Sequence, residues 1–378
     1  MIPLLIVGSI ACLLGYAYSP FPRWSTYFQL WKNVVLNYTV EVPLSVRVQQ
    51  AQLLLKYGLS APFYTFLWYL DELLYPNYKK QKIEPVFIIG SPRSGTTLLH
   101  RTLAQDEETF FAIRHFEWRY PFVIVQKLIK LFYLEDYIKK TNYWPATKIG
   151  NEASKMHANT LYDWEEDGIL FDECFLHHLF VITKFPYPNL MSLLGDLPPQ
   201  GQNHLLAIHQ KVIQKIMYIR GENKIYLSKD VICHTKLNIL IKMYPHAKFI
   251  ICLRPSREFI NSFLALIRAS TMAKTGIDIF TARGLKSVHE RRLRDDCLKL
   301  LDFKHQEELY VLYNKFIKDI RGTVENIYMN FGINMPERYI QHLEQLQASQ
   351  KERKKNYTYE YEEFVGFEAL DNFINSII

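Results

Sequence analysis

One stretch decides the fold of this chain: Val86-Phe-Ile-Ile-Gly-Ser-Pro-Arg-Ser-Gly-Thr-Thr-Leu-Leu-His100. Its first four residues, Val86 to Ile89, are β-branched or aromatic and have the length of a buried strand. Small residues dominate from Gly90 to Gly95, and leucines at helical spacing follow from Thr96. The sequence therefore predicts a strand, a tight turn and a helix in direct succession.

The turn of this unit has the properties of an anion-binding site. The first N–H groups of a helix have no intrahelical partner, and the helix dipole adds positive potential there. The glycines allow close approach of the backbone, and hydroxyl groups on Ser94, Thr96 and Thr97 supply further donors. Arg93 adds a permanent, fork-shaped cation. We expect a phosphate or sulfate group to bind here.

The spacing of Gly90 and Gly95 is that of the nucleotide P-loop, but that motif requires Lys and then Ser or Thr after the second glycine. Thr96 occupies the Lys position, and no lysine lies between Lys82 and Lys127. The sequence therefore disfavours a Walker ATPase or kinase. A P-loop-type nucleotide kinase remains an alternative, which ATP turnover or Mg²⁺ dependence would reveal.

The segment Pro92-Arg93-Ser94-Gly95-Thr96-Thr97 resembles the 5′-phosphosulfate loop of the sulfotransferases, which use 3′-phosphoadenosine-5′-phosphosulfate (PAPS) as donor. It is most similar to the branch with Arg in this loop, which includes tyrosylprotein and many bacterial-type sulfotransferases. The resemblance covers about residues 70 to 366. It implies a P-loop-like, three-layer α/β fold, in which helices flank a central parallel sheet and PAPS lies across the strand ends.

A second segment, from Phe249 to Ser262, is similar to the 3′-phosphate site of this family. In sulfotransferases, an Arg at a strand end and a Ser early in the next helix bind this phosphate, and Arg254 and Ser262 match that spacing. A dianionic phosphate suits a fixed guanidinium with hydroxyl and backbone donors at a helix start. Arg257 either adds charge or is solvated.

The resemblance also implies catalytic residues. The segment Leu227-Ser-Lys229-Asp230 is similar to the Asn-Lys-Asp-Pro segment of the tyrosylprotein enzymes, although Val231 replaces the Pro. We therefore expect Lys229 at a strand end near the sulfuryl group. Together with Arg93, it would stabilise charge on the transferring group and the leaving phosphate.

The base that takes the proton of the acceptor hydroxyl has two candidates. Glu117 lies at the place of the base in the tyrosylprotein branch, and burial by Phe116 and Trp118 would raise its pKa. His115 is the rival, with an ordinary pKa of about 6.5.

A further acidic motif, Asp163-Trp-Glu-Glu-Asp167, resembles an acidic block of bacterial-type relatives. A solvated start of a helix and a role in the site explain these charges equally well.

The composition narrows the class of protein. The 378 residues are 49% hydrophobic and 15% aromatic, which excludes wholesale disorder. The net charge of +7 suits an anionic ligand or a membrane surface, whereas nucleic acid is disfavoured because no dense basic tract or aromatic RNA motif is present. The five cysteines are scattered without zinc or redox spacing, and no metal is implied.

The N-terminal residues Ile2 to Tyr18 are almost entirely apolar, about 17 residues and thus at the short end for a membrane span. We expect residues 1–20 to be an uncleaved single-pass anchor, which makes the enzyme membrane-associated. An apolar helix packed on the domain is the alternative. Arg23 and Lys32 follow the apolar run, which favours a cytoplasmic location for the domain after it. Enzymes of the family that the chain resembles often lie in the Golgi lumen, which favours the opposite side.

Further elements follow from hydrophobic periodicity. We expect a helical lead-in over 21–82 and the sulfotransferase domain over 83–378, with 141–204 as loops and short helices over the active face. The predicted strands are 224–228, 248–253 and 309–313, and the predicted helices are 43–75, 236–243, 258–268, 320–331 and 337–352.

The sequence thus predicts a sulfotransferase that moves a sulfuryl group from PAPS to a hydroxyl acceptor by in-line displacement. The acceptor stays open between a lipid, a carbohydrate, a small alcohol and a protein tyrosine, and the apolar N-terminal third favours a membrane-associated acceptor. Besides the kinase, a membrane-anchored nucleotide-binding protein without catalytic activity remains an alternative.

Overall fold

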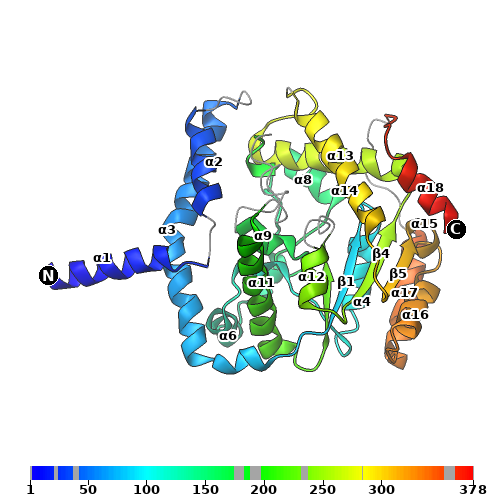
Figure 1. Ribbon diagram of the computed structural model, residues 1–378, viewed down its shortest axis with the longest axis horizontal. Helices are drawn as coiled ribbons and strands as arrows, with labels where there is room; N and C mark the ends of the chain where they lie inside the picture. Colours follow the sequence, from blue (N-terminus) through cyan, green and yellow to red (C-terminus); the bar gives the residue numbers. More distant parts are fainter. Residues whose placement is uncertain are drawn as a thin grey trace.

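The computed structural model describes residues 2–20, 24–36, 42–173, 183–187, 197–230, 237–282, 284–352 and 362–377. Its centre is a five-stranded sheet in the order β2-β3-β1-β4-β5, in which every neighbouring pair is parallel. The strands are β1 (Pro85–Gly90), β2 (Phe110–Phe111), β3 (Ile225–Lys229), β4 (Lys248–Leu253) and β5 (Glu308–Leu312). Helices lie on both faces (Figure 1). The predicted α/β fold with a central parallel sheet is confirmed.

Both faces of the sheet are buried under helices, and alternate residues of each strand contribute to the core on one face or the other. In β1, Val86 and Ile88 join a core with α4 (Thr96–Ala104), α16 (Ile320–Asn330) and α17 (Glu337–Glu352). Phe87 and Ile89 belong to the larger core on the other face. That core includes side chains of α11 (Pro199–Arg220), α12 (Leu237–Met243), α13 (Ser256–Thr275), α14 (Leu285–Asp302) and α18 (Glu368–Ser376).

The strand order fixes where a ligand can bind. β1 is central, with β3 on one side and β4 on the other, so the chain changes direction across the sheet at β1. In open parallel sheets, ligands bind beyond the carboxyl ends of the strands at such a switch point. The registers place Lys229 opposite Ile88 and Cys252 opposite Gly90. The ends of β1, β3 and β4 therefore meet at one edge.

The predicted strands and helices agree with the observed ones to within a few residues, apart from α13, which continues beyond 268 to Thr275. The edge strand β2 and helix α14 were not predicted. The region 141–204 contains α8 (Lys148–Met156), α9 (Gly168–Glu173) and the start of α11, while 174–182 and 188–196 lie outside the described residues. Between β2 and this region lie α5 (His115–Arg119), α6 (Val123–Leu131) and α7 (Glu135–Lys140), and α15 (Tyr313–Phe316) follows β5.

The N-terminal part forms three helices, α1 (Ile2–Ala17), α2 (Trp24–Leu36) and α3 (Leu44–Leu74). Figure 1 shows α1 projecting away from the body of the molecule. It crosses α3 at Gly15, where an added Cβ would lie 2.8 Å from the Cβ of Pro62. Thr65 Oγ1 donates a hydrogen bond of 2.7 Å to the Gly15 carbonyl. The absence of a side chain at Gly15 thus allows the two helices to touch.

The predicted membrane anchor is wrong. Among the described residues, no helix combines the length and the apolar composition that crossing a membrane requires. Helix α1 has 16 residues, and at 1.5 Å per residue it is about 24 Å long, shorter than the hydrocarbon core of about 30 Å. The prediction that residues 1–20 anchor the enzyme in a membrane as a single span, with its body on either side, is therefore corrected.

The helical lead-in is joined to the main domain by a buried ion pair. The carboxylate of Asp71 in α3 accepts the backbone N–H groups of Val123 (2.8 Å) and Ile124 (3.1 Å) at the start of α6. Lys215 of α11 lies 3.1 Å from the same carboxylate, and both side chains are fully buried. The short helix η1 (Pro76–Lys80) then leads into β1. The predicted boundary at residue 82 stays a prediction.

Candidate active site

The turn after β1 is built around two glycines with positive φ. Gly90 has a φ of 152°, and an added Cβ would lie 2.2 Å from the carbonyl oxygen of Cys252 in β4. Gly95 is the N-cap of α4 with a φ of 91°, and an added Cβ would lie 2.7 Å from the ring of Tyr313. Since glycine has no side chain with which to cap α4, the first N–H groups of this helix remain available to an anion.

Arg93 connects the turn to the second predicted motif. Its Nε donates a hydrogen bond of 3.0 Å to Oγ of Ser262 in α13, and its carbonyl oxygen accepts one of 3.1 Å from Nη1 of Arg254. Arg93 has a φ of 64°, a left-handed conformation that costs a non-glycine residue about 1–2 kcal/mol. Such strain is concentrated at functional sites. The three residues predicted from separate motifs are therefore in direct contact.

The guanidinium of Arg254 is held in one orientation. Its Nε donates to the carboxylate of Glu258 at 3.0 Å, one turn into α13. Its Cζ lies 4.2 Å from the centroid of the Tyr313 ring. Tyr313 thus supports both Arg254 and the turn at Gly95, a role that the sequence did not indicate.

The other loop residues surround this contact. Pro92, Ser94 and Thr96 are buried, and Thr97 is half-buried. The backbone N–H of Ser94 donates to the carbonyl of Ser91 at 3.2 Å, which closes the turn. The hydroxyl of Ser94 also donates to this carbonyl, so in this conformation its hydrogen is already engaged.

Lys229 lies at the end of β3 and is buried among carboxylates. Its Nζ donates to Oε2 of Glu166 at 3.0 Å and lies 3.7 Å from Oε1 of Glu165. Burial alone would lower the pKa of Lys229, but Glu166 and Glu165 raise it above its ordinary value. Lys229 is therefore a cation, and the acidic block belongs to the same cluster.

Glu165 is held more firmly than Glu166. Its Oε2 accepts a hydrogen bond of 2.5 Å from Nδ2 of Asn159 and lies 3.4 Å from Nε2 of His157. Burial alone would raise the pKa of Glu165, but Lys229 and His157 hold it well below its ordinary value. Glu165 is thus a fixed anion that orients Lys229.

Asp167, the last residue of the block, is bound to the sheet. Its Oδ2 accepts from the hydroxyl groups of Ser228 (2.8 Å) and Tyr226 (3.0 Å), and it lies 2.8 Å from Nε2 of His209. Its backbone N–H also donates to the carbonyl of Lys229 at 3.2 Å. These bonds fix the acidic block beside β3.

The two predicted bases lie in different surroundings. Glu117 is buried and accepts from Arg220 through both oxygens, at 2.7 Å from Nε and 2.5 Å from Nη2. The backbone N–H of Arg114 also donates to it at 2.7 Å. These bonds join α5 to α11 and engage both carboxylate oxygens of Glu117, and its role as the base stays a prediction.

His115 is connected to the Lys229 cluster but is itself enclosed. Its Nδ1 lies 3.4 Å from Nδ2 of Asn159, which binds Glu165, and its Nε2 accepts from Nε of Arg119 at 2.9 Å. The side chain is fully buried. Both ring nitrogens therefore have partners, and His115 is joined to the Lys229 cluster through Asn159 and Glu165.

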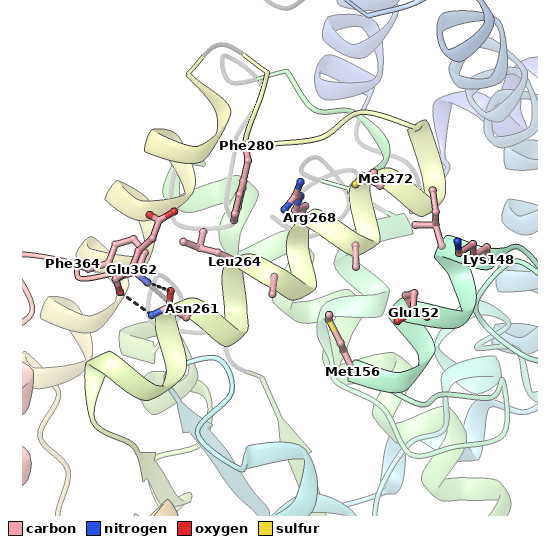
Figure 2. Close-up of a pocket in the computed structure, with 13 residues that line it drawn as sticks. Lys148, Glu152, Met156, Asn261, Leu264, Arg268, Met272, Phe280, Glu362 and Phe364 are labelled. Atoms are coloured by element: carbon pink, nitrogen blue, oxygen red, sulfur yellow. Dashed lines mark hydrogen bonds between the residues drawn. The ribbon is translucent and has the colours of Figure 1, made fainter. Parts of the chain in front are cut away.

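An apolar pocket of about 410 Å³ lies between α8 and α13 (Figure 2). Its apolar lining includes Ile149, Met156, Leu264, Met272, Phe280 and Phe364. At one end, Asn261 precedes Ser262 in the chain and binds both backbone groups of Glu362 at 2.9 Å. At the other end, Lys148 of α8 lies beside the opening (Figure 2). The pocket therefore begins next to Ser262 and extends along α13 toward α8.

Near the C-terminus, the structure describes residues 362–377, and 353–361 lie outside the described residues. The described part lines the pocket through Glu362 and Phe364. In the described ranges, no group of three or more His, Cys, Asp or Glu side chains is arranged as a metal site.

Residues 85–337, more than half of the chain, match the model of the Sulfotransferase family. The chain belongs to this family. Two curated relatives, the omega-hydroxy-beta-dihydromenaquinone-9 sulfotransferases Stf3 of Mycobacterium bovis and Mycobacterium tuberculosis, are each 25% identical over 300 residues, 72% of this chain and 69% of theirs. As a family member, this sulfotransferase is an enzyme that transfers a sulfuryl group to a hydroxyl acceptor. The kinase and the inactive binding protein are thereby set aside.

Solved structures support the fold. Sulfotransferase STF1 from Mycobacterium tuberculosis H37Rv has a TM-score of 0.63 and 16% identity, with 86% of this chain and 90% of that chain covered. Sulfotransferase STF9 from Mycobacterium avium has a TM-score of 0.61 and 13% identity, with 92% and 88% covered. At these identities, the likeness concerns the fold alone.

Proposed function

We propose that this sulfotransferase uses PAPS as its donor and binds it across the ends of β1, β3 and β4. The observation that supports this most strongly is the contact of Arg93 with Ser262 and Arg254. It joins a turn suited to a phosphosulfate group to a motif suited to a second phosphate. Two permanent cations and a helix N-terminus converge there, which fits a donor with several negative charges.

Each part of the site has a role in this proposal. The first N–H groups of α4, with the hydroxyl groups of Thr96 and Thr97, bind the 5′-phosphosulfate. Arg254 and Ser262 bind the 3′-phosphate, and Arg93 lies between the two groups. Lys229 stabilises the charge that develops on the bridging oxygen when the bond to sulfur breaks. Catalysis then consists of positioning and charge stabilisation.

The donor site is tested by isothermal titration with 3′,5′-adenosine bisphosphate (PAP), the spent donor. We expect Arg254→Ala to bind PAP about 30-fold more weakly, since it loses a charge-assisted hydrogen bond worth about 2 kcal/mol. Arg257→Ala is the matched control, because this neighbouring side chain is exposed, and it should bind PAP nearly as tightly as the wild type. A folded wild type that does not bind PAP would refute the proposal.

For the acceptor, we propose an alcohol with an apolar body that lies in the pocket between α8 and α13. Side chains of Leu, Ile, Met and Phe make most of the lining and suit a hydrocarbon, while a few polar side chains, such as Asn261 and Arg268, can bind a single hydroxyl group. The lining includes Asn261, which directly precedes Ser262 of the proposed donor site. The Stf3 relatives are named for a hydroxylated dihydromenaquinone, which is also an apolar alcohol.

This acceptor class is tested by filling the pocket. Ala269 lies on the pocket face of α13, so Ala269→Trp should raise the KM for dodecan-1-ol at least 10-fold and leave PAP binding unchanged. Ala348→Trp, on the exposed face of α17, is the control and should change neither quantity. An unchanged KM in a folded Ala269→Trp enzyme would place the acceptor elsewhere.

A further inference from the structure

The ion pair between Glu166 and Lys229 occupies the place where the donor needs a cation. Glu166 Oε2 accepts the Lys229 hydrogen bond at 3.0 Å, and its side chain retains 10% exposure against 3% for Lys229. Its second oxygen, Oε1, has no hydrogen-bond partner within the described ranges. Glu166 is therefore a carboxylate at the edge of the cluster with one oxygen already unengaged.

The two neighbouring glutamates differ in how they are held. Glu165 is bound by Asn159 and by its contact with His157, and its Oε1 also accepts the backbone N–H of Glu166 at 3.0 Å. Within the part of the chain that the structure describes, Lys229 is the one partner of the Glu166 side chain. An anion that competes for Nζ of Lys229 would thus displace Glu166 and leave Glu165 in place.

We propose that Glu166 is the base of the reaction and that donor binding releases it from Lys229 for this role. The inference rests on the proposed function above, because it needs the donor beside Lys229. The other candidates are less suitable, since Glu117 is bound through both oxygens by Arg220 and His115 is fully buried. Among the described carboxylates, Glu166 alone combines contact with Lys229 and an oxygen without a hydrogen-bond partner.

The step balances as follows. The acceptor oxygen forms a bond to sulfur while its proton passes to the carboxylate of Glu166. The bond from sulfur to the bridging oxygen breaks, and its electron pair stays on the 5′-phosphate of PAP, where Lys229 offsets the charge. The protonated Glu166 then loses the proton to solvent and returns to Lys229 when PAP leaves. Because Lys229 holds Glu166 until the donor arrives, the donor binds before the base becomes available.

Glu166→Gln tests this with two readouts, the affinity for PAP, which should not fall, and kcat, which should. The amide does not compete for Lys229 as an anion does, so PAP should bind with equal affinity or up to about 10-fold more tightly. The kcat for transfer to dodecan-1-ol, or for hydrolysis of PAPS with water as acceptor, should fall about 100-fold or more. Glu166→Asp keeps the carboxylate and should recover part of this kcat.

Glu344→Gln provides the matched control, since Glu344 is an exposed carboxylate on α17 that also pairs with a cation, Arg321, and it should change neither readout. A wild-type kcat in Glu166→Gln would overturn the proposal. So would a parallel loss of PAP affinity, kcat and unfolding midpoint, which would make Glu166 a structural partner of Lys229. Failure of the wild type to bind PAP is a separate result that refutes the donor assignment and this inference with it.

Discussion

The two sides of the proposed donor site each contain a cation paired with a glutamate, but the pairs are built differently. On one side, Arg254 binds Glu258, one turn further along the same segment. On the other, Lys229 binds Glu166, 63 positions away in the sequence. The local pair holds the guanidinium of Arg254 in a fixed orientation. The distant pair exists only because the fold brings the acidic block to the end of β3.

The two cations also differ in how deeply they are buried. The side chain of Arg254 is 19% exposed, whereas that of Lys229 is 3% exposed and lies between two carboxylates. Removing a buried cation leaves its carboxylates without compensation, which costs more than removing a cation near solvent. Substitution of Lys229 should therefore lower both activity and stability, whereas substitution of Arg254 should mainly weaken donor binding.

The largest expected effect belongs to Lys229→Met. We expect kcat to fall about 100- to 1000-fold, because a preorganised charge at the leaving oxygen is lost. The free energy of unfolding should fall by about 3 kcal/mol, because Glu165 and Glu166 remain buried without their cation. Denaturant unfolding and a transfer assay measure the two quantities.

The double variant Lys229→Met/Glu166→Gln separates these effects. Removing one of the two carboxylates left without a cation should restore part of the stability and none of the activity. If Lys229→Met unfolds at the wild-type denaturant concentration, the two sides of the site do not differ in the way their burial indicates.

A second prediction concerns Glu117, the base expected from the family resemblance. We expect Glu117→Gln to lower the free energy of unfolding by about 3 kcal/mol, since it breaks a largely buried ion pair with Arg220. The kcat of the folded fraction should stay within a few-fold of the wild type. A loss of kcat of about 100-fold at unchanged stability would instead make Glu117 the base.

The contrast between the two pairs also explains what the sequence could predict. Arg93, Arg254 and Ser262 lie in short segments in which a strand runs directly into a helix, so local spacing places them at the sheet edge. The contact of Lys229 with Glu166 depends on the path of residues 141–204, for which no local pattern exists. The acidic block was visible as a motif, but its charges fit a solvated helix start equally well.

Other features of the structure also depend on lengths or contacts that the local sequence does not show. Strand β2 has only Phe110 and Phe111, too short for an alternating pattern to be visible. Glu117 was expected to be a base made available by burial, but Arg220, from a helix about a hundred residues later, binds it. The apolar N-terminal run indicated a membrane span, whereas α1 ends after 16 residues and crosses α3 at Gly15.

The smallest expected effect concerns His100, which lies in α4 beside Lys229. Burial, and then the charge of Lys229, lower its pKa to about 4, whereas in the unfolded chain it should be about 6.5. The unfolded chain thus binds more protons as the pH falls, and the free energy of unfolding decreases. For one such group the decrease is about 2 kcal/mol between pH 7 and pH 5.

We therefore expect His100→Gln, measured by denaturant unfolding at several pH values, to reduce the loss of stability between pH 7 and pH 5 by about 2 kcal/mol. His289→Gln is the comparison, because burial in α14 alone lowers the pKa of His289 to about 4. In a Lys229→Met background, the effect of His100→Gln should shrink, since the second cause of its lowered pKa is gone, and that of His289→Gln should not. Equal behaviour of both histidines in that background would mean that the charge of Lys229 does not reach His100.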